Sequence, residues 1–277
     1  MNDYKKIIIF DLDGTLAESK KPIDKEMAKL LRILLERRLV AIISGGTFEQ
    51  LKKAVIDILP PHTMFEHLLI LPTSGASLFA YKKGSWVKLY QYPLTATEVE
   101  KINSVLLGAI GREGLKPEKI YGELIENRET QVTYSGLGQL APLEEKKAWD
   151  PQQTKRKRIV QLISYMLPEF NIRIGGMTSI DITKKGIDKE FGIKKLEEHI
   201  HLPQGIRSTL FVGDALYKGG NDEPAQRTGV ECIQVSSVAE TKKLIRELTR
   251  GRALTYAVYF TIIIVCIAYV GFRIIQF

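Results

Sequence analysis

Two aspartates separated by one residue follow a short apolar run near the start of the chain. Asp11 and Asp13 come directly after residues 6–10 and belong to an Asp-x-Asp-Gly-Thr turn. An apolar run that ends in such a turn is typical of a buried strand that leads into a loop. A carboxylate there can attack phosphorus once a metal ion and a lysine screen the repulsion between its charge and that of the phosphate. We therefore predict that Asp11 is the nucleophile of a phosphoryl-transfer enzyme and forms an aspartyl-phosphate.

Asp13 is placed to serve as the acid and base of the same reaction. Side chains two residues apart on an extended chain point to the same side, so we expect Asp13 beside Asp11. Phosphoryl transfer also needs a group that protonates the departing oxygen. We predict that Asp13 protonates the leaving group and then activates water.

Two further segments carry groups that could hold the phosphate. Ser44 and Gly45 follow the apolar run at residues 39–43, and Lys189 lies in a Gly-Ile-Asp-Lys segment. A hydroxyl and an ammonium group donate hydrogen bonds to phosphate oxygens, and the ammonium group also neutralises their charge. We predict that Ser44, Gly45 and Lys189 form the phosphate-binding site.

Acidic residues in the last third of the chain complete a set of oxygen ligands. Asp214 follows the apolar run at residues 208–212, and Asp222 lies in a Gly-Gly-Asn-Asp segment soon after it. The Asp11 carboxylate and the Asp13 backbone carbonyl would add further oxygens, which are the ligands that Mg²⁺ prefers. We predict a Mg²⁺ site formed by Asp11, Asp13, Asp214 and Asp222.

The elements that must position these residues alternate between strand and helix patterns. Apolar runs typical of buried strands alternate with segments in which apolar residues recur at helical spacing. Such alternation predicts right-handed βαβ units around a parallel sheet, and ligands bind where the carboxyl ends of parallel strands meet. The predicted strands lie at residues 6–10, 39–43, 67–71, 208–212 and 230–235, and the predicted helices at residues 23–38, 48–58, 189–199 and 238–248.

The middle of the chain follows a different pattern. Residues 77–90 predict a hairpin, and the segment at residues 92–183 mixes helical patterns with strands, one of them at residues 128–134. We therefore predict an α/β fold with an inserted α+β cap domain at residues 92–183. The remaining residues, 1–91 and 184–250, form the predicted Rossmann-like core domain with a parallel sheet.

The order of the motifs resembles that of the haloacid dehalogenase superfamily, and the resemblance covers the whole split core. Its motifs are Asp-x-Asp-Gly-Thr, a serine or threonine, a lysine, and Gly-Asp followed by Asn-Asp. An insertion between the second and third motifs is similar to the type IIB branch, where it forms an α/β cap of type C2b. Within that branch the chain most resembles the eukaryotic-type phosphomannomutases. That resemblance rests on Asn127 and Arg128 and on residues 175–181, 186–189 and 213–222.

The resemblance implies which cap residues hold the distal end of a sugar phosphate. In the family this end is held by arginines, a serine and an aspartate, and the matching motifs assign these parts to Arg128, Ser179 and Asp181. Two other positions at which the family has arginine fall at Gln139 and near Lys146. All five residues are predicted to bind substrate, although neither Gln139 nor Lys146 offers the bidentate clamp of a guanidinium group.

The replacement of two cap arginines by Gln139 and Lys146 weakens the predicted site for the distal phosphate, and this bears on the choice between two functions. A mutase must hold a bisphosphate and let it turn over between two phosphate sites, whereas a hydrolase needs one phosphate site and a water. The segment around Ser44 and Gly45 also resembles the phosphatases of the branch more than the mutases. We therefore predict a Mg²⁺-dependent phosphatase that acts on a sugar phosphate, with a phosphomannomutase-like hexose phosphate mutase as the alternative. A second alternative, a membrane-tethered protein that binds without catalysis, would be marked by loss of the catalytic aspartates, and these are present.

The charge of the chain favours a small anionic substrate. There are 40 lysines and arginines against 32 aspartates and glutamates, which gives a formal net charge of +8. The basic run at residues 155–158 predicts a solvated helix face that attracts anions, and we expect no nucleic acid partner because the run lacks interleaved aromatic residues. Two cysteines, Cys232 and Cys266, show no disulfide framework and indicate a reducing compartment. The oligomeric state is left open.

An uncharged apolar segment at residues 253–272 follows a second basic cluster. Its 20 residues, at a rise of about 1.5 Å each, cover roughly the 30 Å of a bilayer core. Tyr256, Tyr259 and Tyr269 lie toward its ends, where such rings favour the membrane interface. The cations before the segment would hold the preceding domain in the cytoplasm. We predict a single-pass membrane protein with a C-terminal transmembrane helix and a cytoplasmic catalytic domain.

Overall fold

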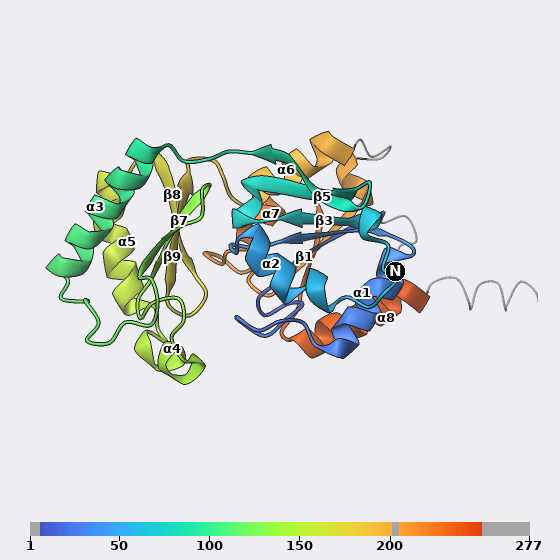
Figure 1. Ribbon diagram of the computed structural model, residues 1–277, viewed down its shortest axis with the longest axis horizontal. Coiled ribbons are helices and arrows are strands. Elements are labelled where there is room, and N and C mark those ends of the chain that lie inside the picture. Colours follow the sequence, from blue (N-terminus) through green and yellow to red (C-terminus); the bar gives the residue numbers. More distant parts are fainter. Residues whose placement is uncertain (1–5, 201–204, 251–277) are drawn as a thin grey trace, which may run out of the picture.

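Two β-sheets, each with helices packed on it, make up the described part of the chain. The computed structural model describes residues 6–200 and 205–250, and Figure 1 shows the two units next to each other along the longest axis. Segments from both ends of the chain form a seven-stranded sheet, and the segment between them forms a four-stranded sheet. The chain crosses between the units after β5 (Ser85–Gln91) and again after β9 (Ser179–Lys184).

The seven-stranded sheet has the order β11-β10-β1-β2-β3-β4-β5. The strands from β11 to β3 run parallel, and the hairpin of β4 and β5 adds two antiparallel strands at one edge. All residues of β1 are buried, which explains why a strand covered on both faces appears in the sequence as a continuous apolar run. The strands are β1 (Ile7–Asp11), β2 (Leu39–Ile43), β3 (Leu68–Leu71), β4 (Ser77–Lys82), β5, β10 (Thr209–Gly213) and β11 (Glu231–Gln234).

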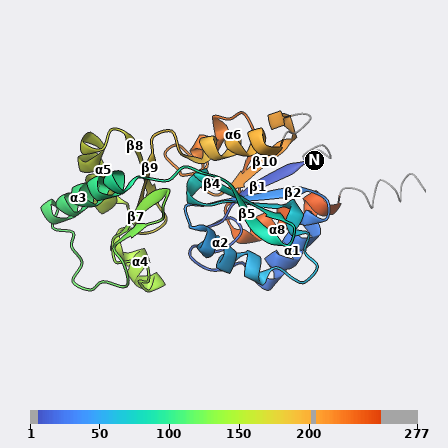
Figure 2. The ribbon, with the colours of Figure 1, turned by 45° about the horizontal axis from the view of Figure 1, so that its top comes forward.

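Helices cover both faces of this sheet, as Figure 2 shows. Helices α1, α2 and α8 pack on the face that carries Ile8 and Phe10, and α6 and α7 pack on the face that carries Ile7 and Ile9. Successive strand residues point to opposite faces, so neighbouring residues of β1 belong to two different hydrophobic cores. The helices are α1 (Lys25–Leu35), α2 (Phe48–Ala54), α6 (Lys189–Ile200), α7 (Glu223–Gln226) and α8 (Val238–Arg250), with 3₁₀ turns η1 (Ile56–Ile58), η2 (Phe65–His67), η3 (Thr73–Gly75) and η4 (Gly205–Ser208).

The four-stranded sheet is antiparallel and has helices on one face only. Its order is β6-β7-β9-β8, and α3 and α5 pack against it around Val132, Tyr134, Ile180 and Ile182. Both ribbon views show its other face turned toward the seven-stranded sheet. The elements are α3 (Ala96–Arg112), β6 (Ile125–Asn127), β7 (Gln131–Ser135), α4 (Leu143–Trp149), α5 (Thr154–Met166), β8 (Phe170–Gly175) and β9. We call this unit the cap and the other the core, while the exact domain boundaries stay a prediction.

The α/β fold with a mostly parallel sheet is confirmed, and so is the hairpin at residues 77–90. The strand predicted at residues 128–134 begins only at Gln131, because the residues before it form a tight turn in which Glu129 has a φ of 62°. The sequence does not predict β6, α4 and α7, since elements of three to seven residues show too little periodicity. Lys189 is the first residue of α6, where the predicted helix at residues 189–199 also begins.

The predicted membrane location is corrected. Within residues 6–200 and 205–250, no helix is both long enough and apolar enough to cross a bilayer. The longest helix there, α3, has 17 residues, about 26 Å at 1.5 Å per residue, and it carries charged residues such as Glu98 and Lys101. The segment at residues 253–272, for which the transmembrane helix is predicted, lies outside the described residues. The prediction of a single-pass membrane protein with a cytoplasmic catalytic domain is therefore wrong as far as the described structure extends.

Arg156 joins the start of α5 to the turn between β8 and β9. Its side chain is 2% exposed, and its Nε donates to Asp150 Oδ2 at 3.0 Å. Its Nη1 donates to the carbonyls of Gly175 and Gly176 at 3.1 and 2.8 Å. The solvated helix face predicted for residues 155–158 is thus interrupted, because α5 turns this one cation inward against the sheet.

We expect Arg156→Met to lower the free energy of unfolding by about 3–5 kcal/mol, since it leaves the Asp150 carboxylate buried without its partner. Equilibrium unfolding in urea measures the change. Arg158→Met, on the exposed face of the same helix, is the matched control and should alter the unfolding free energy by less than about 0.5 kcal/mol. Equal effects of the two substitutions would contradict the structural role of Arg156.

Candidate active site

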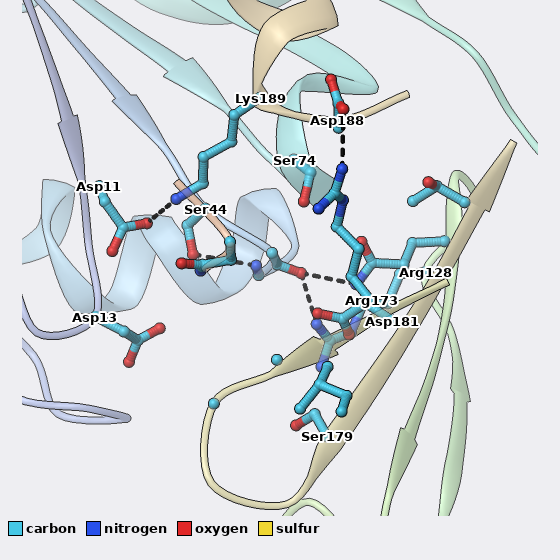
Figure 3. A pocket seen from close by; sticks show the side chains of 18 of the residues that line it. Asp11, Asp13, Ser44, Ser74, Arg128, Arg173, Ser179, Asp181, Asp188 and Lys189 are labelled. Carbon is cyan, nitrogen blue, oxygen red and sulfur yellow. Dashed lines mark hydrogen bonds and ion pairs between the residues drawn. The ribbon is translucent and has the colours of Figure 1, made fainter. Parts of the chain in front are cut away.

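Asp11, the last residue of β1, lies at the carboxyl edge of the parallel sheet and is almost fully buried. Figure 3 shows its carboxylate beside the ammonium group of Lys189, which donates to Asp11 Oδ1 at 2.6 Å. The other oxygen, Oδ2, is buried and has no hydrogen-bond partner among the described residues. Asp11 thus has one oxygen fixed by a cation and one oxygen free to react.

Lys189 is shared between two carboxylates. It begins α6, is 2% exposed, and forms ion pairs with both Asp11 and Asp222. Burial alone would lower the pKa of Lys189, but the two carboxylates outweigh burial and raise it, so the ammonium group stays charged. Burial raises the pKa of Asp11, with Asp222 adding to the rise, and Lys189 opposes both effects.

Three aspartates lie close enough together to bind one cation. Asp11, Asp214 and Asp222 each offer a carboxylate oxygen, and these oxygens lie within 4.8 Å of one another. Burial and the neighbouring Asp222 raise the pKa of Asp214. Three carboxylates opposed by the single charge of Lys189 leave two negative charges in a buried place, which a divalent cation would balance. Oxygen ligands and this charge fit Mg²⁺.

Asp13 belongs to the same region but not to this cluster. Its Oδ1 accepts the backbone N–H of Lys20 at 2.6 Å, and its side chain is only half-buried. The structure thus brings together the three predicted carboxylate ligands, Asp11, Asp214 and Asp222, while the ligand predicted from Asp13 is its backbone carbonyl. The position of Asp13 suits its other predicted part, since a group that exchanges protons with the leaving oxygen must face the substrate.

Gly14 permits the loop after β1 to pass directly over Asp214. Its φ is +84°, and a Cβ atom at this position would lie 2.4 Å from Asp214 Oδ2. Only glycine meets both requirements, a left-handed backbone and this close approach. The glycine of the Asp-x-Asp-Gly-Thr turn therefore has a steric reason in this structure.

Ser44 and Gly45 form the loop after β2. The Ser44 side chain is buried, and its Oγ accepts the backbone N–H of Gly46 at 3.2 Å. The Gly45 carbonyl accepts hydrogen bonds from two cap side chains, Arg128 Nη1 at 2.7 Å and Gln131 Nε2 at 3.1 Å. The predicted phosphate loop is therefore also the place where the cap touches the core.

A cavity of about 70 Å³ lies between the two units. Core residues line one side of it, and the facing surface of the cap sheet lines the other, as the labelled side chains in Figure 3 show. Eight of the predicted site residues take part in this lining: Asp11, Asp13, Ser44, Gly45, Arg128, Ser179, Asp181 and Lys189. Asn221, which precedes Asp222, also lines the cavity.

Two of the predicted cap residues, Arg128 and Asp181, are already engaged by other protein groups. Besides its bond to Gly45, Arg128 donates from Nε and Nη2 to Glu126 at 2.8 and 2.6 Å. Asp181 Oδ1 accepts from Thr133 Oγ1 at 2.8 Å, and burial raises the pKa of Asp181 despite the nearby Arg128. Both side chains are held in position at the cavity by the cap sheet itself.

Gln139 and Lys146 do not line this cavity. They line an adjoining hollow of about 480 Å³, which also borders Asp13, Arg128 and Ser179. Lys146 Nζ donates to the Gln139 carbonyl at 2.8 Å, and burial together with the charge of Lys20 lowers the pKa of Lys146. The predicted cap site is thus divided between the cavity and the hollow beside it.

Sequence reasoning missed several residues that line the cavity, among them Lys20, Gln131 and Arg173. Arg173 pairs directly with Asp181 across β8 and β9, and its Nη2 donates to Asp188 Oδ2 at 3.2 Å. Directly opposed residues of antiparallel strands share a face, so the register would have identified Arg173. The sequence alone does not give that register.

Comparisons with known proteins agree with this geometry. A family model described as eukaryotic phosphomannomutase matches residues 27–250. The phosphomannomutase of Encephalitozoon cuniculi is 27% identical over 235 residues, which cover 79% of this chain and 84% of that protein. The phosphomannomutase of Spinacia oleracea is 28% identical over 227 residues, with 78% and 84% covered.

Solved structures share the fold. A truncated IMP-nucleotidase of Plasmodium falciparum with bound IMP aligns with a TM-score of 0.66 at 15% identity, covering 88% of this chain and 68% of that one. The C-terminal domain of a trehalose-6-phosphate phosphatase from C. albicans aligns with a TM-score of 0.58 at 14% identity, covering 88% and 92%. At these identities the likeness concerns the fold alone.

Replacing Lys189 and replacing Asp11 should have different effects on the free energy of unfolding. We expect Lys189→Met to lower the free energy of unfolding by about 3–5 kcal/mol, because the three clustered carboxylates lose the cation that is paired with Asp11 and Asp222. Asp11→Asn should leave the urea midpoint unchanged or raise it, because it removes one of those like charges and keeps the shape. Both are measured by urea unfolding in EDTA, and a large loss of stability in Asp11→Asn would contradict the charge balance described above.

Proposed function

The chain belongs to the eukaryotic phosphomannomutase family, and we propose on that premise that it is a Mg²⁺-dependent hexose phosphate mutase. It is an enzyme of the haloacid dehalogenase superfamily, a phosphotransferase or phosphohydrolase. The single observation that carries the proposal is the cavity in which the predicted nucleophile of the core faces the predicted sugar-phosphate residues of the cap. The family match favours the mutase that the sequence motifs place second, behind the phosphatase.

In the proposed reaction Asp11 is the nucleophile. Its Oδ2 attacks phosphorus while Lys189 holds Oδ1, a bond forms between Oδ2 and phosphorus, and the bond from phosphorus to the sugar oxygen breaks. Asp13 gives a proton to that departing oxygen. The phosphoryl donor in this first half is a hexose bisphosphate, so the sugar that departs is a hexose monophosphate. In the second half, Asp13 takes the proton from the free hydroxyl group of a hexose monophosphate, the hydroxyl oxygen attacks phosphorus, and the bond between phosphorus and Asp11 Oδ2 breaks, which regenerates a bisphosphate and frees Asp11.

Core residues would balance the negative charge of the transferred phosphoryl group. Lys189 stays protonated throughout, since two carboxylates raise its pKa. Ser44 and Gly45 lie where the oxygens of the transferred group would be held. Mg²⁺ bound by Asp11, Asp214 and Asp222 would neutralise the phosphate charge as the transition state forms.

A sugar-phosphate phosphatase is the second candidate, and one observation supports it. At the far end of the substrate path Lys146 is occupied by the Gln139 carbonyl, and its pKa is lowered by burial. With a weak distal phosphate site, the dephosphorylated sugar would leave once its phosphoryl group has moved to Asp11. Water would then attack the phosphorus bound to Asp11 and release inorganic phosphate.

Product analysis of the full chain separates the two functions. With Mg²⁺, mannose 1-phosphate and a hexose bisphosphate activator, we expect mannose 6-phosphate to form with little release of inorganic phosphate. Asp11→Asn should reduce this conversion by at least about 10³-fold, since no other side chain replaces the nucleophile. Release of inorganic phosphate as the main product would favour the phosphatase, and full conversion by Asp11→Asn would exclude both mechanisms.

We expect Mg²⁺ to stabilise the folded protein. At about 100 times its dissociation constant, an ion that binds only the native state adds about 2.7 kcal/mol to the free energy of unfolding. Asp214→Asn should lose most of that gain, while Asp57→Asn, an exposed carboxylate away from the cluster, should keep it. Urea unfolding with Mg²⁺ and with EDTA measures the difference, and an undiminished gain in Asp214→Asn would place the ion elsewhere.

A further inference from the structure

The side-chain amide of Gln131 has a nitrogen with two hydrogen-bond partners and an oxygen with none among the described residues. It is the first residue of β7, it is fully buried, and it lines the cavity between core and cap. Its Nε2 donates to the Gly45 carbonyl at 3.1 Å and to Thr133 Oγ1 at 2.8 Å, which uses both amide hydrogens. Its Oε1 is equally buried and accepts from no donor within residues 6–200 and 205–250.

The surroundings fix which end of the amide is oxygen. The two ends of a glutamine amide have the same shape, so the assignment must come from the partners. The Gly45 carbonyl has no hydrogen and can only accept, so the NH₂ group must face it. A reversed amide would set its oxygen against the Gly45 carbonyl oxygen, two acceptors with no hydrogen between them. Oε1 is therefore the end of the amide that has no partner within the described residues, in a side chain that lines the cavity.

A buried acceptor without a donor is unfavourable, and most such groups in proteins find a partner. A partner in this cavity must carry a hydrogen that it can donate. The ionised oxygens of a phosphate group offer none, whereas a sugar hydroxyl does. Asp13, which is predicted to exchange protons with a sugar oxygen, lines the same cavity. Oε1 thus suits the sugar part of a substrate rather than its phosphate.

We propose that Gln131 is a substrate-binding residue whose Oε1 accepts a hydrogen bond from one hydroxyl group of the sugar when the cap is closed. This rests on the proposed function, because it takes the ligand to be a hexose phosphate. It adds a residue outside the set predicted from sequence, and it gives the cap a contact that recognises the sugar. The same amide holds the Gly45 carbonyl, so sugar, cap and phosphate loop meet at one side chain.

The test is a binding experiment with the full chain in an Asp11→Asn background, which prevents turnover. Calorimetry with mannose 1-phosphate, its 2-, 3-, 4- and 6-deoxy analogues and inorganic phosphate gives the affinity of each ligand. We expect Gln131→Met, which keeps the length and removes the acceptor, to weaken binding of mannose 1-phosphate about tenfold. The deoxy analogue that lacks the recognised hydroxyl should bind with equal affinity to the protein with Gln131 and to the Gln131→Met variant. Any loss of affinity that Gln131→Met causes for all ligands alike is subtracted first.

Thr130→Val is the control that measures how much affinity every ligand loses when cap closure alone is weakened. Thr130 precedes Gln131 and forms a buried hydrogen bond to Thr73 of the core, but neither threonine lines the cavity or the hollow. It should weaken binding of every sugar phosphate by the same factor, because it only makes cap closure less favourable. If Gln131→Met shows that same uniform loss, or no loss, Oε1 does not bind the sugar and the proposal is wrong.

A different result would contradict the proposed function. If the protein with Asp11 intact produces neither mannose 6-phosphate nor inorganic phosphate, the reaction is wrong, while the binding pattern still decides the part of Gln131. If no sugar phosphate binds although inorganic phosphate does, the assignment of Gln131 to a sugar hydroxyl is overturned and the phosphate site stands.

Discussion

The ammonium group of Lys189, buried between Asp11 and Asp222, is the interaction on which the rest of the site depends. A buried charge is tolerated only where opposite charges and hydrogen bonds surround it. Here the partners come from the end of β1 and from the loop after β10, while the lysine itself begins α6. Three segments far apart in the sequence must therefore come together for Lys189 to be buried with its partners. Because Lys189 also follows directly on the return of the chain from the cap, these ion pairs fix the point at which the cap is attached.

The cap sheet has one apolar face, which packs against the cap helices, and one polar face, which completes the site. Val132 and Ile180 point to the helices, while Gln131, Thr133 and Asp181 point to the core. An antiparallel sheet covered on one side only can show such alternation, and the polar side is then available for binding. Hydrogen bonds within this polar face hold the side chains before a ligand arrives, so the cap presents an ordered surface to the core.

The core motifs could be found from the sequence because each stands at the end of a strand or the start of a helix that is itself visible as an apolar pattern. Asp11, Ser44 and Asp214 follow buried strands, and the parallel sheet necessarily brings strand ends together. The polar face of the cap is different, since Gln131 and Arg173 become neighbours of the site only through the strand register. Their alternation with apolar residues predicts a half-buried strand but not what the polar half faces. The resemblance to a known family identified Arg128 and Asp181, whereas Gln131 and Arg173 had no such signal.

The contact of Arg128 and Gln131 with the Gly45 carbonyl has a consequence for the timing of turnover. These two hydrogen bonds join the cap to the phosphate loop beside a cavity of about 70 Å³, less than half of the about 150 Å³ of an engineered cavity that binds one benzene molecule. In the proposed mutase reaction, a hexose bisphosphate that turns to present its second phosphate to Asp11 would need more room than this cavity offers, and release of Gly45 by the cap would provide it. Each opening would then let the bisphosphate either turn and be enclosed again or escape into solvent. The strength of the hydrogen bonds to this one backbone carbonyl would thus influence how often the intermediate is rebound before it is lost.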